Sequence, residues 1–192
     1  MLRHDLPPQP PQPPGPERPG WLEERLFEQR IILLSGPITG PSASRAAATL
    51  LTLDALGADP IRMQISAPDG DLSAAFALID TLDVMRAPVH AIATAEVGGA
   101  AVGVYAAAQR RLAFPHARFR LAEPKVTGIA GTADEVAAAA GRHLQALEDL
   151  VLRIAAACHQ PRSRVEDDLA AGRLLSAEQA KEYGLVEAIG PA

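Results

Sequence analysis

The sequence contains little cysteine and few aromatic residues. Cys158 is the only cysteine among 192 residues, so no disulfide bond can form within the chain. Cys158 lies in an apolar helical stretch, and we expect it to be an unreactive part of the core. Aromatic residues make up 4% of the chain while hydrophobic residues make up 48%. The core must therefore be built mainly from alanine, leucine, valine and isoleucine.

Long hydrophobic runs and an excess of positive charge are also absent. No apolar run reaches the roughly 18 residues that a membrane helix needs, and no apolar signal core opens the chain. We therefore expect no membrane partner and a cytoplasmic location. The net charge of −5 argues against nucleic acid as the main partner.

The N-terminal segment is rich in proline. Residues 7–19 hold eight of the 17 prolines, which is typical of an extended, solvated segment. We predict a disordered tail over 1–20, followed by one domain over 21–192. A Pro-x-x-Pro spacing at Pro8 and Pro11 leaves open that the tail is bound by a partner.

Beyond the tail, strand-like and helix-like patterns alternate. The predicted strands are 31–36, 61–66, 89–94 and two short strands within 110–122 that are separated at Pro115. The predicted helices are 21–29, a helix ending at Leu56, 72–86, 100–108, a long helix from Thr132 to about His159, and two short C-terminal helices. The strand 31–36 is apolar throughout, which predicts burial on both faces. The alternation predicts an α/β domain with parallel strands and crossover helices.

Several helix starts are predicted from capping residues. Ser42 or Ser44 is the expected cap of the helix that ends at Leu56. Capping-box spacings predict three further starts, at Thr132 with Glu135, Ser163 with Glu166, and Ser176 with Gln179.

Two loops that follow predicted strands are candidate functional sites. They read SAPDG (66–70) and AEVGGAA (95–101), and functional groups in α/β folds gather at such loops. Their glycines would let backbone amides approach a ligand and form an oxyanion hole. The alternative is that these glycines only shape the turns.

Five segments together resemble the proteolytic subunit of the Clp protease (ClpP), a family of serine peptidases. The matching segments are RIILLSGPI (30–38), ISAPDG (65–70), VHAIATAEVGGAAVG (89–103), FPHARFRLAEP (114–124) and LLSAEQAKEYGLVEAIG (174–190). The resemblance covers about residues 21–190 and implies a ClpP/crotonase-like fold.

The resemblance also assigns the positions of the family's catalytic residues. The serine position falls on Gly99, the histidine position on Ala122, and the aspartate position on Asp168. The oxyanion-loop residues fall on Gly70 and Ala100. No serine, threonine or cysteine occurs anywhere in 95–111, so a shifted alignment does not restore a nucleophile. Serine-peptidase chemistry needs a hydroxyl and a base, and this pattern predicts that both are missing.

Other residues are weak substitutes for the missing groups. The histidines are predicted to lie at surfaces or interfaces, and Ser66 and Ser73 have no evident histidine partner. Asp69 places a negative charge in the oxyanion loop, where it would oppose an oxyanion. Asp69, Glu123 and Asp168 fit no metal-binding spacing, so we expect neither a metal nor a cofactor.

The resemblance further implies an assembly. ClpP-like subunits form heptameric rings that join through a protruding handle, which residues 125–159 resemble. We expect a homo- or hetero-oligomer with ClpP-like paralogues, reached by an AAA+ unfoldase through the complex. The family docks the unfoldase with tyrosines, and the corresponding positions here hold Arg62 and Gln64. Beside the ring contact, Asp167 stands where the family often has an arginine.

Three hypotheses of function follow. The first is a catalytically degenerate ClpP-like subunit with a structural or regulatory role in an ATP-dependent Clp protease. The second is a homo-oligomeric scaffold without a Clp partner. The third is a crotonase-like enzyme or acyl-CoA binder, because that group uses paired loop amides without a serine.

Overall fold

The computed structural model describes residues 20–125 and 131–190. The predicted disordered tail, apart from Gly20, and residues 126–130 of the predicted handle lie outside the described residues. The helices are α1 (Gly20–Glu28), α2 (Gly40–Leu56), α3 (Leu72–Val84), α4 (Ala100–Ala107), α5 (Ala133–Cys158), α6 (Arg162–Ala171) and α7 (Ala177–Tyr183). The strands are β1 (Ile31–Ser35), β2 (Ile61–Ala67), β3 (Val89–Gly98), β4 (Arg110–Ala113), β5 (Arg118–Leu121), β6 (Arg173–Ser176) and β7 (Ala188–Ile189).

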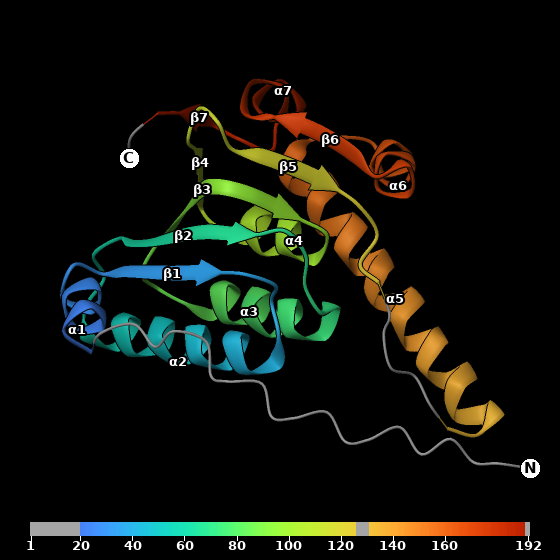
Figure 1. The fold of residues 1–192 in the computed structure, drawn as a ribbon, viewed down its shortest axis with the longest axis horizontal. Coiled ribbons are helices and arrows are strands. Elements are labelled where there is room, and N and C mark those ends of the chain that lie inside the picture. The colour runs from blue at the N-terminus through green and yellow to red at the C-terminus, as the bar shows by residue number, and fades with distance from the viewer. Residues whose placement is uncertain (1–19, 126–130, 191–192) are drawn as a thin grey trace, which may run out of the picture.

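The strands form one mixed sheet in the order β1-β2-β3-β4-β7, and each neighbouring pair along this path is parallel (Figure 1). β3 is long enough to pair with two strands. Its first half pairs with β4, and its last residues pair with β5. β5 in turn pairs antiparallel with β6. The predicted α/β fold with parallel strands and crossover helices is confirmed, while the antiparallel β5–β6 pair was not predicted.

Burial alternates along the first two strands because only one face of this part of the sheet is fully covered. On β2, Ile61, Met63 and Ile65 are completely buried, while the residues between them stay partly exposed. β1 follows the same alternation, with half-buried residues at every second position. The prediction that 31–36 is buried on both faces is therefore wrong.

The structure corrects two of the predicted helix starts. Thr39 caps α2, and the Ser42 hydroxyl accepts a hydrogen bond from the Thr39 amide at 2.9 Å. Pro41 suits the first turn because it lacks the N–H that would be unpaired there. Helix α6 begins after Pro161, so Ser163 lies inside the helix instead of capping it.

The other two capping boxes are present as predicted. The Thr132 side chain accepts a hydrogen bond from the Glu135 amide, and that of Ser176 accepts one from the Gln179 amide.

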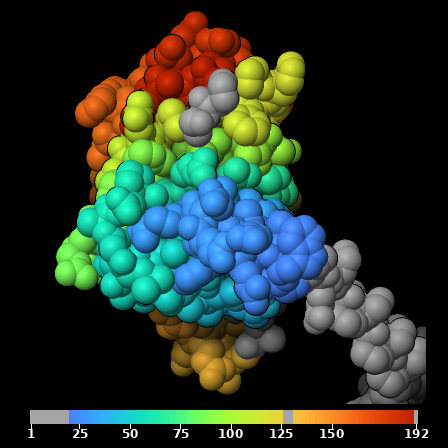
Figure 2. Space-filling view, turned by 90° about the vertical axis from the view of Figure 1, so that its left-hand side faces the viewer, coloured from blue at the N-terminus to red at the C-terminus, as the bar shows by residue number. Residues whose placement is uncertain are grey.

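Helix α5 is the longest element and leaves the body of the molecule. Its C-terminal part is buried, with Leu150 in the notch that Gly103 leaves on α4. Its N-terminal part projects away from the sheet in Figure 1 and is visible in orange below the body in Figure 2. Leu144 on the projecting part is 65% exposed. The protruding handle helix of the predicted fold is therefore present.

Within the described residues, no helix is long and apolar enough to span a bilayer. Cys158 is buried at the base of α5, and burial raises the pKa of its thiol to about 11. A thiol with such a pKa is almost entirely protonated at neutral pH, in line with its predicted core role.

Candidate functional site

The candidate site lies where β2 and β3 end side by side. These strands are parallel neighbours, so the loop between β2 and α3 lies next to the turn between β3 and α4. The turn consists of Gly99 alone, since β3 ends at Gly98 and α4 begins at Ala100. The sequence-predicted loops 66–70 and 95–101 are therefore brought together, as expected for strand ends in an α/β fold.

Gly99 has a backbone conformation that favours glycine. Its φ is 52° and its ψ is −130°, outside the regions that L-residues with side chains populate readily. Its neighbour Gly98 is constrained by contact instead, because a Cβ there would collide with the carbonyl oxygen of Pro68. The turn is thus a sharp strand-to-helix elbow that presents no side chain.

Asp69 fills the space in front of this elbow. Its Oδ1 accepts a hydrogen bond from the Gly70 amide at 2.8 Å. The same Oδ1 lies 2.5 Å from the point where a Cβ on Gly99 would sit. The Asp69 carboxylate therefore lies at the elbow and accepts the hydrogen of the Gly70 amide.

Arg120 joins the two loops from the side of β5. It donates from Nη2 to the Pro68 carbonyl oxygen at 2.6 Å and from Nε to the Glu96 carboxylate at 2.9 Å. Its own carbonyl oxygen accepts a hydrogen bond from the Gly99 amide at 3.2 Å. Arg120 was not singled out in the sequence, because its partners lie up to 52 positions away along the chain.

Ala122 follows β5 directly and is half-buried. Its methyl side chain has no atom that could accept a proton from a nucleophile. Its exposed neighbour Glu123 lines a groove between α5 and α6. In that groove Arg162 forms ion pairs with Glu148 and Glu166.

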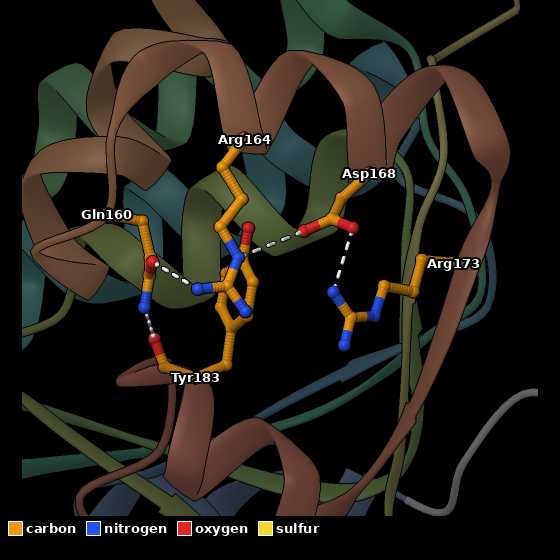
Figure 3. Close-up of polar contacts among 5 residues, drawn as sticks. All are labelled: Gln160, Arg164, Asp168, Arg173 and Tyr183. Carbon is orange, nitrogen blue, oxygen red and sulfur yellow. Dashed lines mark hydrogen bonds and ion pairs between the residues drawn. The ribbon is translucent and has the colours of Figure 1, made fainter.

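Asp168 lies on α6 and is held by arginines (Figure 3). Its Oδ1 accepts a hydrogen bond from Nη1 of Arg173 at 2.9 Å, and its Oδ2 lies 4.0 Å from Nε of Arg164. The guanidinium groups of both arginines also lie over the ring of Tyr183, at 5.2 and 5.8 Å from its centre. Among the described residues, no hydrogen bond or ion pair joins Asp168 to Gly99 or Ala122.

Tyr183 completes this cluster from α7. Its carbonyl oxygen accepts a hydrogen bond from Gln160, which itself accepts one from Arg164. Burial, followed by the neighbouring Asp168 carboxylate, raises the pKa of the Tyr183 hydroxyl. The Tyr183 hydroxyl and the Oδ2 atom of Asp168 are both buried, and no hydrogen bond of ordinary geometry joins them. We therefore attribute the raised pKa mainly to burial.

Comparisons with known proteins agree with this fold and with these motifs. The family model described as "Clp protease" matches residues 17–192. This chain belongs to the Clp protease family. Two similar proteins are each named "ATP-dependent Clp protease proteolytic subunit 3", from Rhizobium johnstonii and Rhizobium etli. Each is 32% identical over 169 residues, covering 87% of this chain and 87% of the relative.

Ser73, Asp71 and the histidines of this Clp protease family member lie in the following surroundings. Ser73 donates a hydrogen bond to Oδ1 of Asp71 at 2.6 Å, and Asp71 caps α3. The hydrogen bond from Ser73, followed by the one from the Ala74 amide, lowers the pKa of Asp71. His116 and His159 are exposed, and in the described ranges no histidine hydrogen-bonds to a serine. Within 20–125 and 131–190, no group of three or more His, Cys, Asp or Glu side chains could hold a metal ion.

Arg62 and Gln64 lie on the partly exposed face of β2. Arg62 is in register with His90 on β3, which is in register with Arg110 on β4. Three basic residues therefore lie in one row across the sheet. In the described part of the chain, none of the three takes part in an ion pair with a carboxylate.

Proposed function

We propose that this chain is a catalytically degenerate homologue of the proteolytic subunit that acts as a structural or regulatory member of an ATP-dependent Clp protease. The observation that carries the proposal is the elbow at Gly99. The residue at the sharp turn has no side chain, and the loop opposite it places the Asp69 carboxylate against that residue. A nucleophile is absent where the resemblance puts one, and a carboxylate opposes any oxyanion.

The surroundings of Asp168 support the same conclusion. An aspartate retained from a triad would orient a histidine, but Ala122 supplies no imidazole. Here the carboxylate bonds to Arg173 and lies beside Arg164. Asp168 thus has a role in joining α6 to β6 that does not depend on catalysis.

The projecting part of α5 supports an assembly role. An exposed leucine such as Leu144 on a helix that leaves the body is suited to burial against another subunit. We propose that the handle joins this chain to ClpP-like paralogues, in homo- or hetero-oligomeric heptameric rings, and we expect the complex in the cytoplasm. An AAA+ unfoldase would reach the complex through the paralogues, because Arg62 and Gln64 stand where the resemblance places the docking tyrosines.

The two alternatives have less support. A crotonase-like enzyme or acyl-CoA binder needs its loop amides to be open to a thioester oxygen, whereas the Gly70 amide is bonded to Asp69. A homo-oligomeric scaffold without a Clp partner shares every feature of the fold, so only its assembly behaviour separates it from the leading proposal.

Native mass spectrometry combined with a serine-reactive fluorophosphonate tests the proposal. The purified chain is measured alone and after mixing with an active Clp proteolytic subunit from the same cell. We expect mixed rings in which only the active subunit carries the label. Label on this chain would refute the degenerate assignment, and failure to form mixed rings would favour the scaffold.

A further inference from the structure

The Asp69 side chain reaches across the gap between the two loops of the candidate site. A single oxygen, Oδ1, accepts the Gly70 amide hydrogen at 2.8 Å and lies 2.5 Å from the Cβ position that Gly99 lacks. Asp69 therefore occupies both the space of a side chain on the elbow and the hydrogen-bond donor that would face a bound ligand.

The loop that carries Asp69 is held in place by its backbone. The Asp69 carbonyl oxygen accepts a hydrogen bond from the Ile38 amide at 3.1 Å, and the Asp71 amide donates to the Ile38 carbonyl oxygen at 2.8 Å. Arg120 holds the Pro68 carbonyl oxygen from the other side. Because the backbone is fixed on both sides of Asp69, the side chain can be changed without releasing the loop.

The elbow contributes a second amide at the start of α4. Ala100 provides the first amide of α4 and is completely buried. Among the described residues, no backbone oxygen outside the helix accepts its hydrogen. Amides at a helix start attract negative charge, and hydrogen bonds from amides to a carboxylate are stronger than those between neutral groups.

We propose that the two loops form a carboxylate-binding cradle that this chain fills with its own Asp69. The inference rests on the proposed function, because it takes Gly70 and Ala100 as the remains of an oxyanion hole. It goes further than the loss of cleavage. A site filled in this way also does not bind the carboxylate or a carbonyl group of a peptide. Removing the Asp69 side chain should open the cradle to a carboxylate from solution.

The test uses the full chain and trifluoroacetate as a carboxylate probe, with binding followed by the broadening of its fluorine NMR line. The variants are Asp69→Gly and Asp69→Ala, which both remove the carboxylate, and Asp69→Asn, whose Oδ1 can still accept from the Gly70 amide. We expect the Gly and Ala variants to bind the probe about tenfold or more tightly than the native chain, as expected for a charged hydrogen bond. The native chain and Asp69→Asn should show little broadening, and acetate should reverse the broadening in the other two.

The site of binding is checked by adding Gly99→Ala to the Asp69→Gly variant. The new methyl group would lie in the space that Asp69 vacated, so the broadening should disappear. Three outcomes would overturn the proposal. They are equal broadening with the native chain, binding by Asp69→Asn, and no binding by folded Asp69→Gly or Asp69→Ala. Circular dichroism establishes that the variants are folded. Labelling of the native chain by a fluorophosphonate would refute the proposed function without producing any of these results, so the two failures are distinguishable.

Discussion

At the scale of single residues, Asp168 is held by charged neighbours that stabilise the fold. Its side chain is 13% exposed and is held by Arg173, which is 42% exposed. A hydrogen bond that involves charged groups contributes about 1.5–3 kcal/mol, and exposure of one partner reduces that contribution. The contacts of Asp168 with Arg173 and with the cluster of Arg164 and Tyr183 therefore give Asp168 a measurable effect on the stability of the fold.

We predict that Asp168→Ala lowers the free energy of unfolding by about 1–2 kcal/mol. Arg173→Ala should give a similar loss, and the double variant should lose less than the sum, because both changes remove the same interaction. Denaturant unfolding measures all three variants. Asp167→Ala is the matched control, since Asp167 is exposed on the same helix and should change stability by less than about 0.5 kcal/mol. Additive losses would show that the contact between Asp168 and Arg173 contributes little.

The same scale shows which site residues the sequence could and could not reveal. The two glycine-containing loops were predicted to lie at strand ends, because a motif and its spacing are local. The reach of Asp69 to Gly99 and the bonds of Arg120 to Glu96 and Pro68 were not, since they join residues 24 or more positions apart. Such contacts depend on strand register, which the sequence pattern alone does not specify.

At the scale of elements, α5 has two parts that differ in burial. The base packs into the core, where Leu150 fits against Gly103 and is completely buried. The outer part carries two exposed apolar side chains, those of Leu144 and Val136. One helix therefore joins the core to a surface suited to assembly.

We predict opposite results for two matched substitutions on α5. Leu150→Ala should lower the free energy of unfolding by about 3 kcal/mol, because it leaves a cavity in the core. Leu144→Ala should change that free energy by less than about 0.5 kcal/mol but weaken the oligomer. Denaturant unfolding and analytical ultracentrifugation measure the two effects. An oligomer that is unchanged by Leu144→Ala would show that this part of the helix does not contact another subunit.

Element prediction succeeded for the long helix α5 and failed for the last two strands. The 26-residue α5 was predicted with both of its ends, because a capping box and an amphipathic stripe support each other. The four-residue β6 and the two-residue β7 were missed. Strands of that length offer few positions for alternation, and β6 and β7 form because partner strands are already in place, whereas the equally short β4 and β5 were predicted.

At the scale of the whole molecule, the two ends of the sheet have different chemistry. The loops at the carboxyl ends of β2 and β3 place the Asp69 carboxylate against Gly99. Near the opposite ends, the aligned row of Arg62, His90 and Arg110 makes a polar, basic surface in a chain with a net charge of −5. Apolar side chains of a partner would gain little there, because contact would remove water from charged groups without pairing them.

We therefore predict that rings made only of this chain bind an AAA+ unfoldase weakly, and that mixed rings bind it in proportion to their content of active subunits. Replacing both Arg62 and Gln64 with tyrosine should strengthen unfoldase binding by about tenfold, since the aromatic side chain of each tyrosine adds apolar area to a half-exposed face of the sheet. Arg45→Tyr, on the exposed side of α2, is the control and should leave binding unchanged. Surface plasmon resonance with immobilised rings measures the affinities. If native rings of this chain alone bind as tightly as rings of the active subunit, the basic row is not a barrier to docking, and the chain contributes directly to recruiting the unfoldase.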